Sequence, residues 1–407
     1  MSGLGANLTR LAILRRAIDA ASANDAGGRR VRATADGPSV LVEMPEFGSN
    51  PGQLCSYVHR PAELPDRPAL VVCLHGCTQT AASYDLGSGW SALADRYGFI
   101  ALFPEQQSRN NPNTCFTWFG DDDTRRDSGE ALSIRQMIDT VIAVHDVDPS
   151  KVFITGLSAG GAMASSMLAA YPDVFSAGAI VAGLPAGSAS GVSEALAAMA
   201  RGRSHSQRQW GDLARAASAH NGPRPRISVW HGTGDSVVSP VNAEACMLQA
   251  VDLHGLVLVP SVDETSGAYR RRVWRNDQER AVVEVHTIEG MGHGVALATE
   301  GDERCGQPGS YQFDVGISSP IRILEFFGIT DGAQFKATPT EASKQSEQQK
   351  PGPAPEVKNA RSSVFEVLRD SGVLNSTATG RRRFPPLSQE LHRIIDAAMR
   401  LGRPPKK

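Results

Sequence analysis

Short apolar runs recur through the middle of the chain and alternate with stretches whose apolar residues follow helical spacing. The runs occupy residues 69–74, 99–103, 152–155, 179–181, 227–230 and 282–288. Runs that are apolar on both faces are typical of parallel strands covered by helices on each side. The helical spacing occurs between them, at residues 131–147, 160–171 and 241–254. This alternation predicts an α/β fold with a mostly parallel, doubly wound sheet and helices on both faces.

The pattern changes towards both ends of the chain, which predicts four segments. Residues 1–38 are expected to form an amphipathic or flexible segment, and their short apolar run is interrupted by two arginines, unlike a secretory signal. Residues 39–329 hold the alternating pattern and all of the candidate chemistry. Residues 330–360 are rich in Thr, Gln, Lys, Glu and Pro, which predicts a disordered linker. Residues 361–407 are expected to form a basic tail with short helices.

The basic tail contains an amphipathic stretch at residues 386–401. From residue 381 onward it has eight Lys or Arg against two Asp or Glu. Such a stretch can bind a partner or an anionic surface, or it can be a solvated helix that binds nothing. The sequence leaves these three interpretations open.

Composition narrows the class of protein. The chain is 41% hydrophobic and 21% charged, which is ordinary for a soluble enzyme. A formal net charge of −2 provides no overall field that would attract nucleic acid or an acidic membrane. No apolar run reaches the roughly 18 residues that a membrane-spanning helix needs. The sequence therefore predicts neither a nucleic-acid-binding protein nor a transmembrane protein.

The six cysteines are too few for a disulfide scaffold, and no CxxC pair indicates a zinc site. Cys73 lies inside an apolar run and is interpreted as a small buried hydrophobe. One or two disulfides among the other cysteines remain open, and the spacing does not choose a pairing. These others are Cys55, Cys77, Cys115, Cys246 and Cys305.

A Gly-x-Ser-x-Gly motif at residues 156–160 provides a candidate nucleophile, Ser158. The segment KVFIT precedes it as a predicted strand, and residues 161–171 follow it as a predicted helix. This strand–turn–helix context is the nucleophile elbow of the α/β-hydrolase fold, in which the flanking glycines leave room for a strained turn. Ser158 would then lie at a helix N-terminus, which stabilises a developing negative charge.

The acid and the base are sought downstream, because this fold orders its triad as Ser, Asp or Glu, His. Asp235 lies in a glycine-rich loop after the predicted strand at 227–230, and His293 lies between glycines after the last predicted strand at 282–288. We therefore expect Asp235 to orient His293, which activates Ser158. His286 lies within a strand and is a poorer candidate. Three further histidines are set aside because they precede or miss the site: His220, His231 and His254.

Two backbone amides are candidates for the oxyanion hole. In this architecture one donor is the amide that follows the nucleophile, which is Ala159 here, and the other comes from the loop after an earlier strand. The loop after residues 69–74 predicts Cys77 N–H for the second donor, with Gly76 allowing close approach. This role uses the backbone, so the Cys77 side chain is not implicated in the chemistry.

Six motifs in order resemble the poly(3-hydroxybutyrate) depolymerase family of esterases. They are LHGCTQ at 74–79, NTCFTWF at 113–119, RDSGE at 126–130, GLSAGGAM at 156–163, HGTGD at 231–235 and DVGISS at 314–319. The resemblance covers roughly residues 39–328. A set of six ordered motifs is far more specific than any one of them.

The resemblance implies a serine carboxylic ester hydrolase that acts on polyhydroxybutyrate-type or other short acyl esters through an acyl-enzyme on Ser158. It implies no metal or organic cofactor, and it assigns the triad to Ser158, Asp235 and His293. It also pairs Cys77 with Cys115 if the protein meets an oxidising compartment. Because members are often exported, an extracellular location is expected, with the cytoplasm as the alternative since no signal peptide is visible.

Several features bear on the substrate. The family includes feruloyl and acetylxylan esterases, so fold and motifs do not fix the ester. Trp118 and Phe119 are candidates for the substrate pocket, whereas Trp90 and Trp274 are interpreted as packing residues. The aromatic residue that often follows the catalytic His in the family is missing after His293, which favours a wider or weaker acyl pocket.

No fibronectin-like or lectin-like module is visible after residue 328. We therefore expect soluble oligomers or small esters rather than crystalline polymer as substrates. Two alternatives remain: a peptidase with the same triad, and a non-catalytic binding protein on a hydrolase fold, which only the basic tail supports.

Overall fold

The computed structural model of the protein describes residues 30–32 and 38–330, and the statements that follow concern these residues. The predicted linker and basic tail, from residue 331 onward, lie outside them, as does most of the predicted N-terminal segment. Residues 30–32 of that segment form a short strand, β1 (Arg30–Arg32). In the described part of the chain, no helix is both long enough and apolar enough to cross a membrane.

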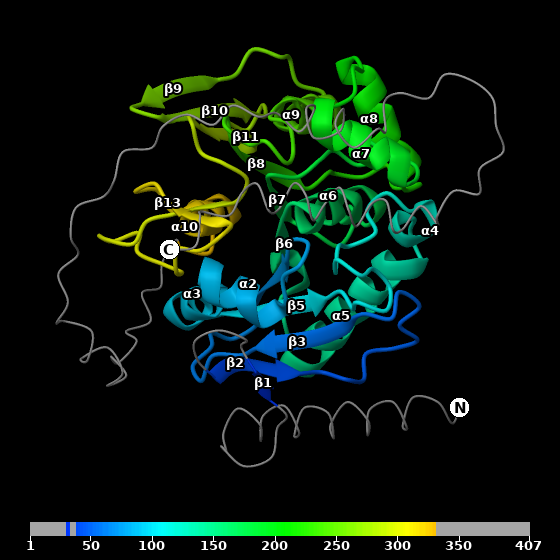
Figure 1. Cartoon of the computed structure of the whole chain (residues 1–407), viewed down its shortest axis with the longest axis vertical. Helices are drawn as coiled ribbons and strands as arrows, with labels where there is room; N and C mark the ends of the chain where they lie inside the picture. Colours follow the sequence, from blue (N-terminus) through cyan, green and yellow to red (C-terminus); the bar gives the residue numbers. More distant parts are fainter. Residues whose placement is uncertain (1–29, 33–37, 331–407) are drawn as a thin grey trace, which may run out of the picture. The chain divides into compact units, whose positions relative to one another are not determined.

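An eleven-stranded sheet runs through the molecule, in the order β1-β2-β3-β5-β4-β6-β7-β8-β11-β10-β9 (Figure 1). Its central strands, from β5 to β11 in this order, all pair in parallel. Antiparallel strands extend both edges. The bounds are β2 Pro38–Glu43, β3 Cys55–His59, β4 Ala69–Leu74, β5 Phe99–Glu105, β6 Val152–Leu157, β7 Ala177–Val181, β8 Arg226–Gly232, β9 Val262–Ser266, β10 Tyr269–Arg275 and β11 Ala281–Ile288. The prediction of a mostly parallel sheet is confirmed.

Helices cover both faces of this sheet. The bounds are α2 Ala81–Ser88, α3 Trp90–Tyr97, α4 Asp121–Thr124, α5 Gly129–His145, α6 Ala159–Ala170, α7 Val192–Arg201, α8 Gln207–Ala216, α9 Val241–Leu253 and α10 Ser319–Phe327, with a 3-10 turn at Pro149–Lys151. On one face, Val71 and Cys73 of β4 join a buried cluster with Trp90 of α3 and Phe327 of α10. Because side chains alternate along a strand, Leu70 and Val72 point to the other face. There α6 packs against β4, β6 and β7.

Within the described residues, the predicted strands and helices all form, with bounds that differ by a few residues. The run at 282–288, however, is not the last strand of the chain. Two short strands follow it, β12 (Val295–Leu297) and β13 (Gln312–Asp314), and they pair in parallel in a small separate sheet. The segment after β11 therefore folds back as an ordered layer, and it carries His293 at its start.

Candidate active site

Ser158 occupies a sharp turn between β6 and α6. Its backbone has φ 58° and ψ −118°, which a residue other than glycine rarely adopts. A Cβ at Gly156 would lie 2.3 Å from the Gly160 carbonyl oxygen, and a Cβ at Gly160 would lie 2.3 Å from the Leu74 carbonyl oxygen. Both positions therefore require glycine, because helix α6 begins in direct contact with β4 and β6. The result is the elbow that the motif predicts.

Asp235 and His293 form a buried hydrogen-bonded pair. His293 Nδ1 lies 2.7 Å from Asp235 Oδ2. The other carboxylate oxygen, Oδ1, accepts hydrogen bonds from the backbone N–H groups of Val237 and Val238, each at 2.8 Å. Asp235 is 6% exposed and His293 is 8% exposed. The carboxylate is thus fixed by its own loop, and it in turn fixes the orientation of the imidazole.

The surroundings of Asp235 keep it ionised. Burial alone would raise the pKa of this carboxyl, but the facing His293 and the hydrogen bonds from His231 and His293 outweigh burial and hold the pKa well below its ordinary value. A carboxylate that stays charged across the working pH range can stabilise the imidazolium that forms when His293 accepts a proton.

His231 belongs to this cluster, which corrects the expectation that it misses the site. It is the penultimate residue of β8, and its Nε2 lies 3.2 Å from Asp235 Oδ2 and 2.9 Å from the Val238 carbonyl oxygen. Since the carbonyl only accepts hydrogen bonds, Nε2 carries the proton and is shared between the two oxygens. The signal in the sequence was the spacing, because HGTGD places two glycines between His231 and Asp235 and so permits a turn that brings them together.

The topology brings the three predicted triad residues to one edge of the sheet. Ser158 follows β6, Asp235 follows β8 and His293 follows β11, and these strands are parallel members of one sheet whose carboxyl ends share an edge. Among the described residues, no hydrogen bond joins Ser158 Oγ to His293. Contacts between a nucleophile and its base are often long before substrate binds.

The two predicted oxyanion donors lie on separate elements. Ala159 is the first residue of α6, where backbone N–H groups have no partner within the helix. Cys77 lies in the loop between β4 and α2 and forms a disulfide with Cys115, the pair that the family resemblance indicates. In the described part of the chain, no hydrogen bond uses the Cys77 N–H.

The predicted pocket residues are adjacent to one another. Trp118 is buried, Phe119 is half-buried, and their rings pack edge to face with centroids 5.4 Å apart. Their part in binding substrate stays a prediction. Trp90 and Trp274 are 1% and 2% exposed, as expected of packing residues. Within the described residues, no group of three or more His, Cys, Asp or Glu side chains is placed to hold a metal ion.

Similarity to known proteins shows the family of the chain. A model of the family described as Esterase PHB depolymerase matches residues 54–276. Poly(3-hydroxyalkanoate) depolymerase C of Paucimonas lemoignei is 45% identical over 291 residues, which are 71% of this chain and 70% of that protein. Acetylxylan esterase of Coprinopsis cinerea is 32% identical over 262 residues, 63% of this chain and 69% of the relative.

A solved structure is similar to this chain in fold. The acetyl xylan esterase from Aspergillus awamori is similar with a TM-score of 0.61 at 26% identity, over 71% of this chain and 99% of that chain. Together with the family match, this similarity shows that the sheet and its helices form an α/β-hydrolase fold.

Proposed function

The chain belongs to the esterase PHB depolymerase family and is a serine carboxylic ester hydrolase, and from this premise we propose that Ser158, His293 and Asp235 are its catalytic triad. The observation that carries the assignment is the 2.7 Å contact between His293 Nδ1 and Asp235 Oδ2. Ser158 supports it, because its strained elbow lies at the same edge of the sheet.

The proposed reaction is acyl transfer in two steps. Ser158 Oγ attacks the ester carbonyl while His293 Nε2 takes the hydroxyl proton, and the collapse of the tetrahedral intermediate expels the alcohol, which receives that proton from His293. Water then attacks the acyl-enzyme with His293 again acting as base, which releases the acid and restores Ser158. Throughout, Asp235 holds Nδ1–H and stabilises the charged ring.

The Ala159 and Cys77 N–H groups are proposed to hydrogen-bond the negative oxygen of each tetrahedral intermediate. Loss of one such donor typically costs about 10²- to 10³-fold in kcat. The helix that starts at Ala159 contributes its N-terminal dipole to the same oxygen. The proposed chemistry therefore uses the protein's own residues alone, and no cofactor enters any step.

For the substrate we propose 3-hydroxyalkanoate oligomers and other short acyl esters, with Trp118 and Phe119 lining the pocket. The relative that is 45% identical is a poly(3-hydroxyalkanoate) depolymerase by name. Acetylated xylan is the second candidate, because the solved acetyl xylan esterase is matched over 99% of its chain. The alternation of strands and helices supports residues 39–329 as the catalytic domain, and the disulfide supports an extracellular location, because disulfides persist in oxidising compartments.

The test compares wild type with Ser158→Ala on p-nitrophenyl esters of increasing acyl length, 3-hydroxybutyrate oligomers and acetylated xylan. Ser166→Ala is the matched control, since Ser166 lies on the same helix but donates its hydroxyl to the Ala162 carbonyl oxygen at 3.1 Å. We expect Ser158→Ala to lose about 10⁶-fold in kcat and Ser166→Ala to retain turnover. Wild-type turnover by folded Ser158→Ala would overturn the assignment.

A further inference from the structure

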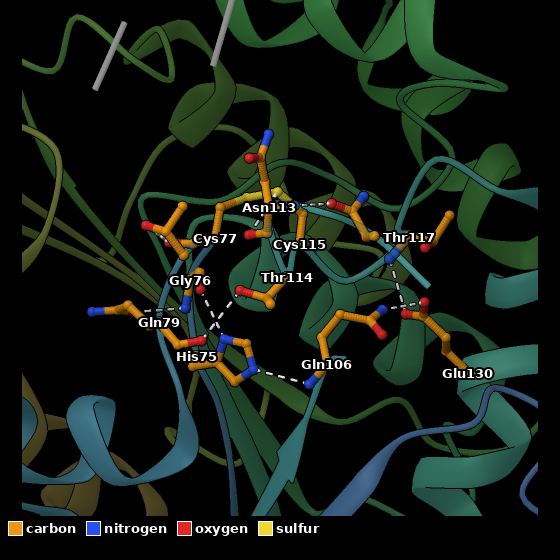
Figure 2. The surroundings of a disulfide bond; sticks show 12 residues. His75, Gly76, Cys77, Gln79, Gln106, Asn113, Thr114, Cys115, Thr117 and Glu130 are labelled. Carbon is orange, nitrogen blue, oxygen red and sulfur yellow. Dashed lines mark hydrogen bonds between the residues drawn. A yellow bond between two sulfur atoms is a disulfide. The ribbon is translucent and has the colours of Figure 1, made fainter. Parts of the chain in front are cut away.

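A ring of buried polar contacts surrounds the loop that carries the proposed Cys77 donor. The loop leaves β4 through His75 and Gly76 and reaches the start of α2. Figure 2 shows the His75 ring beneath this loop, between the Gly76 carbonyl and the backbone of Gln106. His75 is 0% exposed, and it touches none of the triad residues through a hydrogen bond of the described chain. Its position therefore needs a separate explanation.

The partners of His75 settle which of its nitrogens carries the proton. The backbone N–H of Gln106 donates to His75 Nε2 at 3.1 Å, so Nε2 has no proton of its own. Nδ1 is then the protonated nitrogen, and it donates to the Gly76 carbonyl oxygen at 2.7 Å. Burial lowers the pKa of His75 to about 4, so the ring stays neutral and keeps this tautomer at neutral pH.

The bond from His75 reaches the oxyanion donor through one peptide group. The Gly76 C=O and the Cys77 N–H belong to the same planar trans peptide, in which the two groups point in opposite directions. A hydrogen bond that holds the carbonyl towards the buried imidazole therefore turns the Cys77 N–H away from it. Such a bond also polarises the peptide, which strengthens the N–H as a donor.

Gln106, which donates to His75, is itself held in place by buried Glu130. The Gln106 side chain donates to Glu130 Oε1 at 2.5 Å, while its backbone N–H serves His75. Glu130 is 2% exposed, and its Oε2 accepts the Thr117 N–H at 2.9 Å. Burial raises the pKa of Glu130 to about 8.

The ring of contacts closes through the segment that begins at Asn113. The Thr78 N–H donates to the Asn113 carbonyl oxygen at 2.6 Å, and the Cys77–Cys115 disulfide joins the same two segments. Figure 2 shows the disulfide above the His75 ring. The Gly76 carbonyl oxygen thus accepts a short hydrogen bond from the imidazole and a longer one, 3.3 Å, from the Gln79 N–H, while the disulfide fixes the Cys77 side chain.

We propose that His75 is a positioning residue whose Nδ1–H holds the Gly76–Cys77 peptide in the orientation that presents the Cys77 N–H to the oxyanion. The inference rests on the proposed function, since it presupposes acyl transfer by Ser158. His75 itself does not touch substrate, and it acts through the peptide alone.

Two substitutions separate positioning from simple packing. In His75→Asn the amide nitrogen takes the place of Nδ1, so the donor to Gly76 is kept and the acceptor for Gln106 is lost. In His75→Gln the amide oxygen takes the place of Nε2, so the acceptor is kept and the donor to Gly76 is lost. Each variant loses one of two buried hydrogen bonds, so their losses of thermal stability should be similar.

The readouts are kcat, KM and the affinity for a trifluoromethyl ketone. Its hemiketal adduct with serine carries an oxyanion. We expect His75→Gln to lose about 10- to 100-fold in kcat and a similar factor in ketone affinity, with KM nearly unchanged. His75→Asn should stay within about threefold of wild type in both. A purely structural role would give the two variants equal kcat, and that result would overturn the proposal.

A control variant and a second measurement separate failure of the positioning role from failure of the proposed function. Turnover by Ser158→Ala would refute the proposed function itself, whereas inactive Ser158→Ala beside equal His75 variants refutes the positioning role alone. If either His75 variant fails to fold, nitrogen-15 NMR of wild type labelled at histidine and cysteine decides. A proton on Nδ1 of His75 and a downfield shift of the Cys77 amide in the ketone adduct are expected, and a proton on Nε2 or an unmoved amide contradicts the proposal.

Discussion

Two buried pairs of histidine and carboxylate lie near the ends of β8 and β11 or within β11, and they differ in whether the histidine keeps a nitrogen without a hydrogen bond to the described residues. His293 Nδ1 lies 2.7 Å from Asp235, and His286 Nε2 lies 3.0 Å from Glu284. His286 and Glu284 belong to β11, whereas His293 and Asp235 lie in loops beyond the ends of β11 and β8. The lengths of the two contacts alone would not reveal which pair is catalytic.

The difference lies in the remaining nitrogen. His286 Nδ1 accepts a hydrogen bond from the Tyr269 hydroxyl at 2.7 Å, and its ring stacks on Trp230 with centroids 3.9 Å apart. The other oxygen of Glu284 accepts from Arg271 at 2.6 Å. In contrast, no hydrogen bond of the described residues uses His293 Nε2. A closed network is structural, whereas a pair with one nitrogen left for a reacting group can transfer protons.

The largest expected effect comes from the same substitution at both histidines. His293→Gln should lower kcat by about 10⁶-fold, because no base remains for Ser158, and it should also lower the melting temperature, because the contact from Nδ1 to buried Asp235 is lost. His286→Gln should lower the melting temperature and leave kcat within about twofold, because its network is remote from the acyl transfer. Steady-state kinetics and thermal unfolding of both variants check this. Equal losses of kcat in the two variants would contradict the assignment of His293, rather than His286, as the base.

The next effect concerns the carboxylates. Asp235→Asn should lower kcat by about 10⁴-fold, since the neutral amide no longer fixes the tautomer of His293 or stabilises its charge. Glu284→Gln is the matched variant and should retain turnover. The same kinetic assay checks both, and near wild-type kcat for a folded Asp235→Asn would remove this residue from the triad.

Acidification should inactivate the enzyme, because its proposed general base is a histidine. The pKa of Asp235 is held low, so its carboxylate stays charged, and burial lowers the pKa of His286, so that ring stays neutral. A general base acts only when it is unprotonated, so turnover that depends on His293 should fall on the acid side of the kcat/KM profile. Profiles of wild type and His286→Gln over about pH 5 to 8 should coincide, and a flat wild-type profile would contradict the role of His293.

The smallest effect is expected at His231. His231→Leu removes the second donor to Asp235 Oδ2 but leaves the His293 contact and both backbone bonds, so kcat should fall only about tenfold. His231→Gln places an amide where Nε2 lies and should recover most of that loss. Turnover of the two variants, with thermal unfolding as the control for folding, checks the prediction. An unchanged kcat in His231→Leu would show that its hydrogen bond to Asp235 does not contribute to turnover.

The sequence predicted those features whose cause is local. Parallel strands such as β4 and β6 were visible because burial on both faces demands continuous apolar runs. The elbow was visible because Gly156 and Gly160 have no room for a Cβ. The placement of His286 in a strand was also predicted, and it lies buried in β11.

Features that depend on tertiary pairing were missed. β10 reads as YRRRVWR, and its arginines form ion pairs with distant carboxylates, as Arg270 does with Asp263 and Arg272 with Glu244. Such a strand carries no apolar alternation for sequence analysis to detect. The place of His231 beside Asp235 and the ring around His75 were missed for the same reason. Their partners are set by how loops fold back, and the HGTGD spacing gave a signal for His231 only.

The most direct test of the account is the site of the covalent intermediate. Wild-type enzyme would be acid-quenched during turnover of a p-nitrophenyl ester, or treated with a fluorophosphonate, and the adduct located by peptide mass spectrometry. We predict one adduct on Ser158 and none in Ser158→Ala. An adduct on another residue, or equal labelling of the Ser158→Ala variant, would contradict the central claim.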